Sequence, residues 1–259
     1  MDASVLYAQE GEAGEAKALI DPNALSKNGT ISLMSESISR DGDKIAYMLS
    51  SAGSDWGTIK FKDIRTGEEH TDVLKHVKFS CLEWSHDGKG VFYNWYPDSN
   101  DASADDGTET TSNSNQKLRY HELGTSQSDD PIVLEKPDQP SWLIGIDISI
   151  CGRYGIVYFS QSCDPKCAVY YIDFSTINYE IKGQLQLEPL FTEFDAAYHY
   201  ITNENDTFYF ITDFEAPLKR LVCFDLKNPA KASWKDILPH DPKLGALLKS
   251  HLVTLQVFK

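Results

Sequence analysis

Four copies of one short pattern run along the chain, and this repeat constrains the fold more than any other feature of the sequence. Each copy opens with a turn-forming stretch of four residues, and a run of β-branched and aromatic residues follows. The copies begin at residues 39, 85, 149 and 202, so 46, 64 and 53 residues separate them, and the fourth copy is degenerate. Repeats of about 40–50 residues with several short strands each are typical of β-propeller blades.

The local chemistry of each copy favours an antiparallel sheet. The dipeptides Asp41-Gly42 and Asp87-Gly88 supply the positive φ that a tight turn between strands requires. The β-branched and aromatic runs after each turn suit pleated strands. Further strand-like runs complete the copies at residues 56–61, 117–121, 168–172 and 220–224. We therefore predict an all-β chain with several short antiparallel strands in each copy.

Three stretches lack this strand pattern. Residues 97–116 (PDSNDASADDGTETTSNSNQ) hold five acidic residues and no basic one, so they cannot bury enough apolar surface to become ordered. They predict an exposed acidic loop inserted in the second copy, and a functional lid or interface loop is the alternative. Residues 10–18 predict a loop rather than a helix. For residues 242–249 the sequence is equally compatible with a short helix and with a loop.

The charge balance argues against two classes of partner. The chain has 24 Lys and Arg against 39 Asp and Glu, a net charge of −15. A nucleic-acid-binding protein needs a basic face, and an anionic membrane surface repels an acidic chain. We therefore expect no nucleic-acid partner and no membrane association.

The cysteines and the N-terminus indicate a reducing compartment. Five cysteines are an odd number, and the N-terminal residues lack the basic and apolar regions of a signal peptide. Free thiols in the cytoplasm are the expectation. Cys163 and Cys167 have a spacing that could suggest a metal site, but no second Cys/His pair has ligand spacing, so we predict no metal.

Common catalytic motifs do not occur in this sequence. It contains no Gly-x-Ser-x-Gly nucleophile elbow, no phosphate-binding glycine loop and no His-Glu-x-x-His pair. None of the seven histidines has a metal-binding partner at helical spacing, so we expect them to be structural or at the surface. From spacing alone, the chain is a binding or shielding scaffold with no catalytic residue and no cofactor.

Several longer motifs resemble the prolyl oligopeptidases. The resemblance runs from about residue 4 to about residue 240, and several of its motifs are at least five residues long. The residues that carry it lie at 21–26, 51–61, 77–81, 84–97, 106–110, 116–118 and 163–165.

The resemblance implies a fold and a function. In that family a seven-bladed propeller caps an α/β-hydrolase domain that cuts short peptides after proline, and the propeller limits entry to small peptides. Residues 1–259 resemble the propeller only, so we expect a partial seven-bladed β-propeller with about four blades of four-stranded antiparallel sheets. The catalytic α/β-hydrolase domain is expected to be absent. Alone, the chain would then be inactive, and its partners would be proline-containing peptides and the missing hydrolase domain of the same protein.

Four residues take expected roles from this resemblance. Phe79 matches a phenylalanine that forms an apolar wall of the substrate pocket, and a blade-core aromatic is the alternative. Leu143 stands where the family often has methionine and keeps an apolar contact. Cys163 matches a cysteine that lines the same pocket, and an ordinary free cysteine in a turn is the alternative. Asp55 is expected to face the hydrolase domain, near an arginine on its catalytic side.

A different class of function competes with this interpretation. The chain could be a non-catalytic propeller that binds peptides or proteins, as propellers with Trp-Asp repeats do. The Gly-His and Trp-Asp dipeptides of those repeats do not recur in this sequence, which favours the peptidase propeller.

Overall fold

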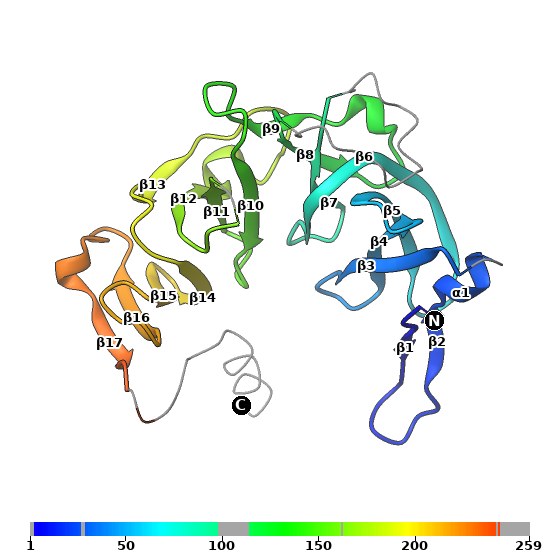
Figure 1. Cartoon of the computed structure of the whole chain (residues 1–259), viewed down its shortest axis with the longest axis horizontal. Helices are drawn as coiled ribbons and strands as arrows, with labels where there is room; N and C mark the ends of the chain where they lie inside the picture. The colour runs from blue at the N-terminus through cyan, green and yellow to red at the C-terminus, as the bar shows by residue number, and fades with distance from the viewer. Residues whose placement is uncertain (1–2, 27–28, 98–113, 162, 242, 244–259) are drawn as a thin grey trace. The chain divides into compact units, whose positions relative to one another are not determined.

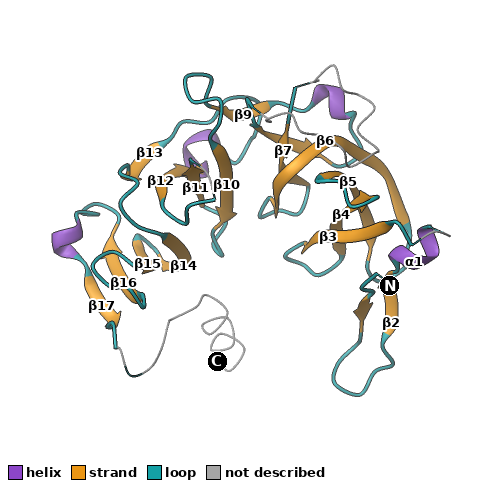
Figure 2. Ribbon diagram, in the orientation of Figure 1, coloured by secondary structure: helices purple, strands orange, loops and turns teal. Residues whose placement is uncertain are grey.

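β-Strands make up almost all of the regular structure. The computed structural model describes residues 3–26, 29–97, 114–161, 163–241 and 243. The chain divides into two compact units, residues 1–145 with 181–185 and residues 146–180 with 186–259, and strands dominate both (Figure 2). The stretch 98–113, which is most of the expected acidic loop, and residues 244–249, which are most of the possible helix, lie outside the described residues.

The first unit begins with a small hairpin and a single helical turn. Strands β1 (Leu6–Ala8) and β2 (Lys17–Ile20) pair antiparallel, and turns connect them, as expected for a loop in this part of the chain. Helix α1 (Pro22–Leu25) follows directly. Asp21 caps this helix by accepting a hydrogen bond from the backbone N–H of Asn23, and Pro22 suits the first helical turn.

A seven-stranded antiparallel sheet forms most of the first unit's strand structure, with its strands in sequence order (Figure 1). Its central strand, β6, is 16 residues long and has different partners along its length. Residues from Glu69 to Lys78 pair with β5, whereas Leu82 to Trp84 pair with β7. Strand β6 is thus the last strand of one four-stranded group and the first strand of the next. The strands are β3 (Ile31–Ile38), β4 (Lys44–Ser51), β5 (Trp56–Asp63), β6 (Glu69–Trp84), β7 (Gly90–Trp95), β8 (Lys117–Glu122) and β9 (Ile132–Glu135).

The second unit contains two four-stranded antiparallel sheets, each again in sequence order. Strand β10 starts in the first unit, whose main segment ends at Gly145, and continues into the second. The first sheet holds β10 (Leu143–Ile148), β11 (Tyr154–Ser160), β12 (Cys167–Asp173) and β13 (Glu188–Phe191). The other holds β14 (Tyr198–Glu204), β15 (Thr207–Thr212), β16 (Arg220–Asp225) and β17 (Lys235–Leu238). The short 3-10 helices are η1 (Gln127–Asp129), η2 (Phe174–Ile177) and η3 (Lys231–Ser233).

The predicted fold class is confirmed. The seven-stranded sheet counts as two four-stranded groups that share β6, and the second unit adds two more, which agrees with about four blades. Each sheet places bulky apolar side chains in a core. In the first unit Phe61 and Trp84 are buried in an edge-to-face contact at 6.0 Å. In the second unit buried aromatic rings of Phe191, Phe210 and Phe224 lie within 5.4–5.6 Å of one another.

The repeated turns share one hydrogen-bond pattern. In the first copy the hydroxyl of Ser39 donates to Asp41 Oδ1 at 2.6 Å, and the same hydroxyl accepts from the N–H of Lys44 at 2.9 Å. Ser85 and Asp87 repeat this arrangement in the second copy. The glycine after each aspartate has φ of +78° or +65°, which only glycine adopts without strain. The recurring sequence pattern thus reflects a recurring turn.

The third copy replaces the turn aspartate by cysteine. Cys151 Sγ lies 3.4 Å from the hydroxyl of Ser149, and Asn203 Nδ2 lies 3.5 Å from the same sulfur. Ser149 still accepts from the N–H of Tyr154 at 2.9 Å. The position keeps the serine of the other two copies and adds Asn203. Burial raises the pKa of the Cys151 thiol, but hydrogen bonds from Ser149, the backbone and Asn203 outweigh it and lower that pKa.

Restoring aspartate at this turn should stabilise the second unit. In Cys151→Asp, Ser149 and Asn203 would donate to a carboxylate, which accepts stronger hydrogen bonds than a thiol. We expect the free energy of unfolding to rise by about 1 kcal/mol, the usual net value of such a bond. Urea denaturation would measure the gain. Cys151→Ala should give no gain, and equal stabilities of the two variants would contradict this explanation.

Candidate functional site

Phe79 lies where β6 exchanges one partner strand for the other. The pairing register breaks between Val77 and Leu82, and Phe79 has φ of +48°, a left-handed conformation that is costly for a bulky residue. Its side chain is 53% exposed. The ring therefore does not pack into the core of the first unit, and the strand switch presents it to solvent.

A buried lysine lies beneath this ring. Lys78 Nζ lies 5.2 Å from the ring centre of Phe79 and 5.3 Å from that of Trp56, both within the range of a cation–π contact. Asp55 Oδ2 lies 3.6 Å from the same ammonium group. The side chain of Lys78 is 6% exposed, whereas that of Asp55 is 61% exposed. The ammonium group thus connects Asp55 to Phe79, two residues that sequence reasoning selected separately.

A T-shaped aromatic pair packs beside this lysine. The rings of Trp56 and Tyr96 lie 5.8 Å apart at 78°. Burial raises the pKa of Tyr96 to about 12, and the hydrogen bond from Gln116 opposes that shift. The phenol therefore stays neutral at physiological pH, and Lys78 and Asp55 provide the charges of this part of the site.

Two buried amide side chains connect the strand switch to the start of β10. Gln116 Nε2 donates to the carbonyl oxygen of Phe79 at 3.2 Å, and its Oε1 accepts from the N–H of Ile144 at 2.7 Å. Asn94 Oδ1 accepts from the N–H of Cys81 at 2.8 Å, and its Nδ2 donates to the Ile144 carbonyl at 2.7 Å. These four bonds bring Leu143, the half-buried neighbour of Ile144, to the same network as Phe79.

Cys163 belongs to the other unit. It is exposed, in a turn where Asp164 Oδ1 accepts from the N–H of Lys166 at 3.0 Å. Phe79, Leu143 and Asp55 all lie in the first unit, whereas Cys163 lies in the second. Its expected role in a substrate pocket stays a prediction.

Sequence reasoning missed the residues that organise this site. Lys78 and Gln116 lie within motifs that carry the family resemblance, but their type and spacing alone gave them no role. Gln116 is also the last residue of the stretch expected to be an exposed loop, and it is only 3% exposed. A glutamine placed directly before a strand was the available signal, and it is a weak one, since its partners lie 28 and 37 residues away.

A second polar cluster in the first unit has a different character. His121 lies between two carboxylates, with Nδ1 2.8 Å from Asp130 and Nε2 3.1 Å from Asp72. Tyr93 donates its hydroxyl to Asp130 at 2.8 Å, and Gly124 donates its N–H to Asp72 at 2.6 Å. The histidine and both carboxylates are buried, so this cluster links strands and turns inside the sheet, as expected for a structural histidine.

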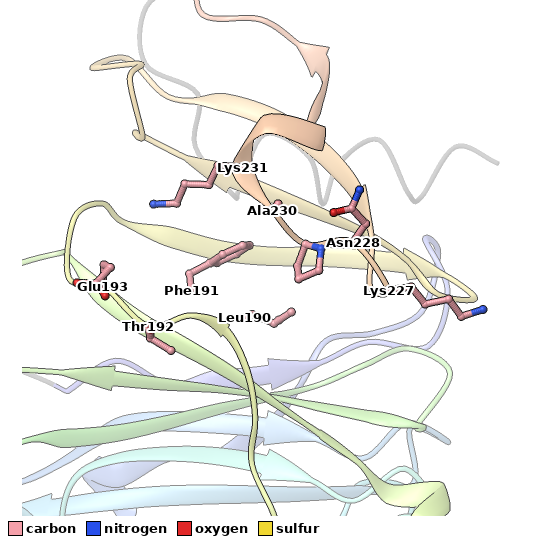
Figure 3. Close-up of a pocket in the computed structure, with 9 residues that line it drawn as sticks. Leu190, Phe191, Thr192, Glu193, Lys227, Asn228, Ala230 and Lys231 are labelled. Carbon is pink, nitrogen blue, oxygen red and sulfur yellow. The ribbon is translucent and has the colours of Figure 1, made fainter.

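The second unit contains a groove of about 410 Å³ (Figure 3). Leu190 and Phe191 of β13 line one side, and the segment after β16 lines the other. Lys231 forms an ion pair with Asp195, and its Nζ lies 3.9 Å from the ring centre of Phe214. None of the four residues predicted from the sequence lines this groove. The remaining lining residues are Thr192, Glu193, Lys227, Asn228, Pro229 and Ala230.

Within residues 3–26, 29–97, 114–161, 163–241 and 243, no group of three or more His, Cys, Asp or Glu side chains could hold a metal ion. No helix in the same residues is long and apolar enough to cross a membrane.

The strand arrangement and the repeat define a β-propeller-type chain, and comparison with known proteins identifies its family. A family model described as the N-terminal β-propeller domain of prolyl oligopeptidase matches residues 1–253. The chain therefore belongs to the prolyl oligopeptidase family, as part of the family's propeller domain.

Known relatives and solved structures agree with this assignment. The chain is 30% identical to prolyl oligopeptidase A of Amanita bisporigera and 33% identical to a prolyl endopeptidase of Elizabethkingia meningoseptica, over 92% and 91% of its length. It spans about a third of those relatives, 32% and 31% of their lengths. A solved prolyl endopeptidase structure superposes with a TM-score of 0.77 at 32% identity, covering 92% of this chain and 33% of the other. Prolyl oligopeptidase B of Galerina marginata, solved with a 35mer substrate, gives 0.79 at 26% identity, covering 92% and 35%.

Proposed function

We propose that this chain is the propeller part of a prolyl oligopeptidase-like serine endopeptidase and limits access to the active site to short proline-containing peptides. In this proposal Phe79 and Leu143 form apolar walls of the substrate path, and Cys163 lines the same path. Asp55 faces the α/β-hydrolase domain of the same protein. The location is cytoplasmic, which five cysteines without a disulfide support.

The exposed ring of Phe79 is the observation that carries the proposal. An exposed aromatic side chain that the surrounding structure holds in place is suited to anchor a ligand contact. Phe79 is held by a strained backbone, a buried lysine and a buried amide, and it is 53% exposed. The family assignment supports peptides as the ligands, because relatives over this region are named prolyl endopeptidases.

Removal of the Phe79 ring should weaken peptide binding. The test titrates a short synthetic peptide with an internal proline into the isotope-labelled chain and follows backbone amide shifts by NMR. For Phe79→Ala we expect the dissociation constant to rise about tenfold, or about 1.4 kcal/mol, as for the loss of one aromatic contact. A folded protein that carries the same peptide sequence in a surface loop should not compete for binding.

Tyr179 provides a matched control for this test. It is also an exposed aromatic residue with positive φ, 54% exposed with φ of +60°, and it lies in the second unit. Tyr179→Ala should leave the dissociation constant unchanged. Equal affinities of the wild-type chain and Phe79→Ala would refute the assignment of Phe79, and absence of any peptide-dependent shift would refute the proposed function.

A further inference from the structure

Gln116 occupies a position that the proposed function does not explain. Its side chain is almost fully buried, and its amide nitrogen lies 3.2 Å from the Phe79 carbonyl oxygen and 3.1 Å from the Tyr96 hydroxyl. The Lys78 carbonyl oxygen lies at 3.5 Å. On the other side of the amide, Oε1 accepts from the N–H of Ile144. Both ends of the amide are therefore occupied, and each end holds the backbone of a different part of the first unit.

The strand switch explains why such an amide is needed. Where β6 leaves β5 and turns to β7, its carbonyl groups leave the regular ladder, and buried backbone carbonyls need a donor. The positive φ of Phe79 is strained and persists only where neighbouring groups enforce it. The bond from Gln116 provides the donor that the Phe79 carbonyl needs. It also helps to hold the strained backbone of Phe79 in place, because it acts on that same residue.

We propose that Gln116 is a positioning residue that fixes the direction of the Phe79 ring and the separation between Phe79 and Leu143. This inference rests on the proposed function insofar as the ring contacts a peptide. Gln116 itself acts only through the backbone of Phe79 and of Ile144, the neighbour of Leu143. It converts a flexible exposed ring into a preorganised apolar wall, so the ordering cost is not incurred when a ligand binds.

Gln127, in η1, supplies a control with the same chemistry, because its side chain also bonds to the backbone of β6. Its Oε1 accepts from the N–H of Lys75 at 3.0 Å, and its Nε2 donates to the Lys75 carbonyl at 2.9 Å and the Tyr93 hydroxyl at 3.2 Å. Gln116 and Gln127 thus each hold the backbone of β6 with one amide, and only the former acts at Phe79. Gln116→Met and Gln127→Met remove equivalent hydrogen bonds with little change in size.

The direct test places 4-fluorophenylalanine at residue 79 of the full chain and records its ¹⁹F signal. The parent chain should give one narrow line. Gln116→Met should shift or broaden this line and raise the dissociation constant for the proline peptide about tenfold, as for a lost preorganised contact. Gln127→Met should leave the line in place and change the affinity less than about twofold, even if it lowers the melting temperature, since it acts away from Phe79.

A measurement on the unsubstituted chain covers the case in which Gln116→Met does not fold. The side-chain amide protons of Gln116 should exchange slowly with solvent and show nuclear Overhauser contacts to the backbone of Phe79. Fast exchange without those contacts would overturn the proposal, as would an unaltered ¹⁹F line in folded Gln116→Met. If no variant or parent chain binds the peptide, the proposed function fails, whereas the ¹⁹F line still decides whether Gln116 positions the ring.

Discussion

Replacing His121 by phenylalanine should lower the free energy of unfolding by about 3–5 kcal/mol, the usual cost of leaving a buried charge without its partner. Asp72 and Asp130 would lose the ring that bridges them, and their side chains are only 4% and 1% exposed. Phenylalanine keeps the packing, because the His121 ring already stacks on Phe61 at 5.8 Å and 27°. Urea denaturation followed by circular dichroism would measure the loss.

The same histidine should make stability depend on pH. Burial disfavours its protonated form, but hydrogen bonds and charge attraction from Asp130 and Asp72 outweigh this effect and raise the pKa of His121. A histidine with a higher pKa in the folded state stabilises the fold below its unfolded pKa and loses that contribution as pH rises through the folded pKa. We therefore expect stability to decline as pH rises above about 6.5, the unperturbed histidine value.

Two comparisons decide whether His121 is responsible. His121→Phe should lack the decline above pH 6.5, whereas the wild-type chain should have it. His86 is exposed in the turn before β7, so His86→Phe should change the free energy of unfolding by less than about 0.5 kcal/mol and keep the pH dependence. A pH profile of His121→Phe that matches the wild type would show that other groups titrate.

Gly90→Ala should destabilise the first unit by about 3 kcal/mol or more, at the upper end of the cost of overpacking. A Cβ atom at this position would collide with the backbone carbonyl oxygen of His121 and lie 2.8 Å from Cζ of Tyr120. The backbone has little freedom to move away, because Gly90 exchanges hydrogen bonds with Ser85 through both its N–H and its carbonyl group. Thermal and urea unfolding would both record the loss.

Gly57 offers the matched comparison for this prediction. A Cβ atom there would also clash, but mainly with Cε and Cγ of Met48, a flexible side chain that can change rotamer. Gly57→Ala should therefore cost less than about 1.5 kcal/mol, as for a tolerated core change. Equal losses for the two variants would mean that the close approach to the His121 carbonyl is not the cause.

The sheets could be predicted from the sequence because the turns between their strands are fixed by local hydrogen bonds. Ser39 and Asp41, and later Ser85 and Asp87, bond to groups within five residues, so the same short pattern produces the same turn each time. Apolar strand runs between such turns then leave few alternatives to an antiparallel meander. The strand runs expected at 56–61, 117–121, 168–172 and 220–224 accordingly lie within β5, β8, β12 and β16.

The candidate site could be predicted only in part, because its contacts are not local. Resemblance selected Phe79, Leu143 and Asp55, but the positive φ of Phe79 depends on the pairing of β6 with two different strands. The sequence alone predicts only an ordinary strand lysine at Lys78, because its contact with Trp56 exists only in the folded chain. Gln116 acquires its role from partners in β6, in β10 and directly after β7.

The shared strand β6 also limits how this surface can evolve. Side chains alternate regularly after the register break, so the gain or loss of one residue between Leu82 and Trp84 would turn the later side chains to the opposite face of the second group of strands. By contrast, the connections between repeated turns tolerate spacings of 46, 64 and 53 residues. Homologues should therefore keep the length of this strand constant, while insertions accumulate in the connecting segments.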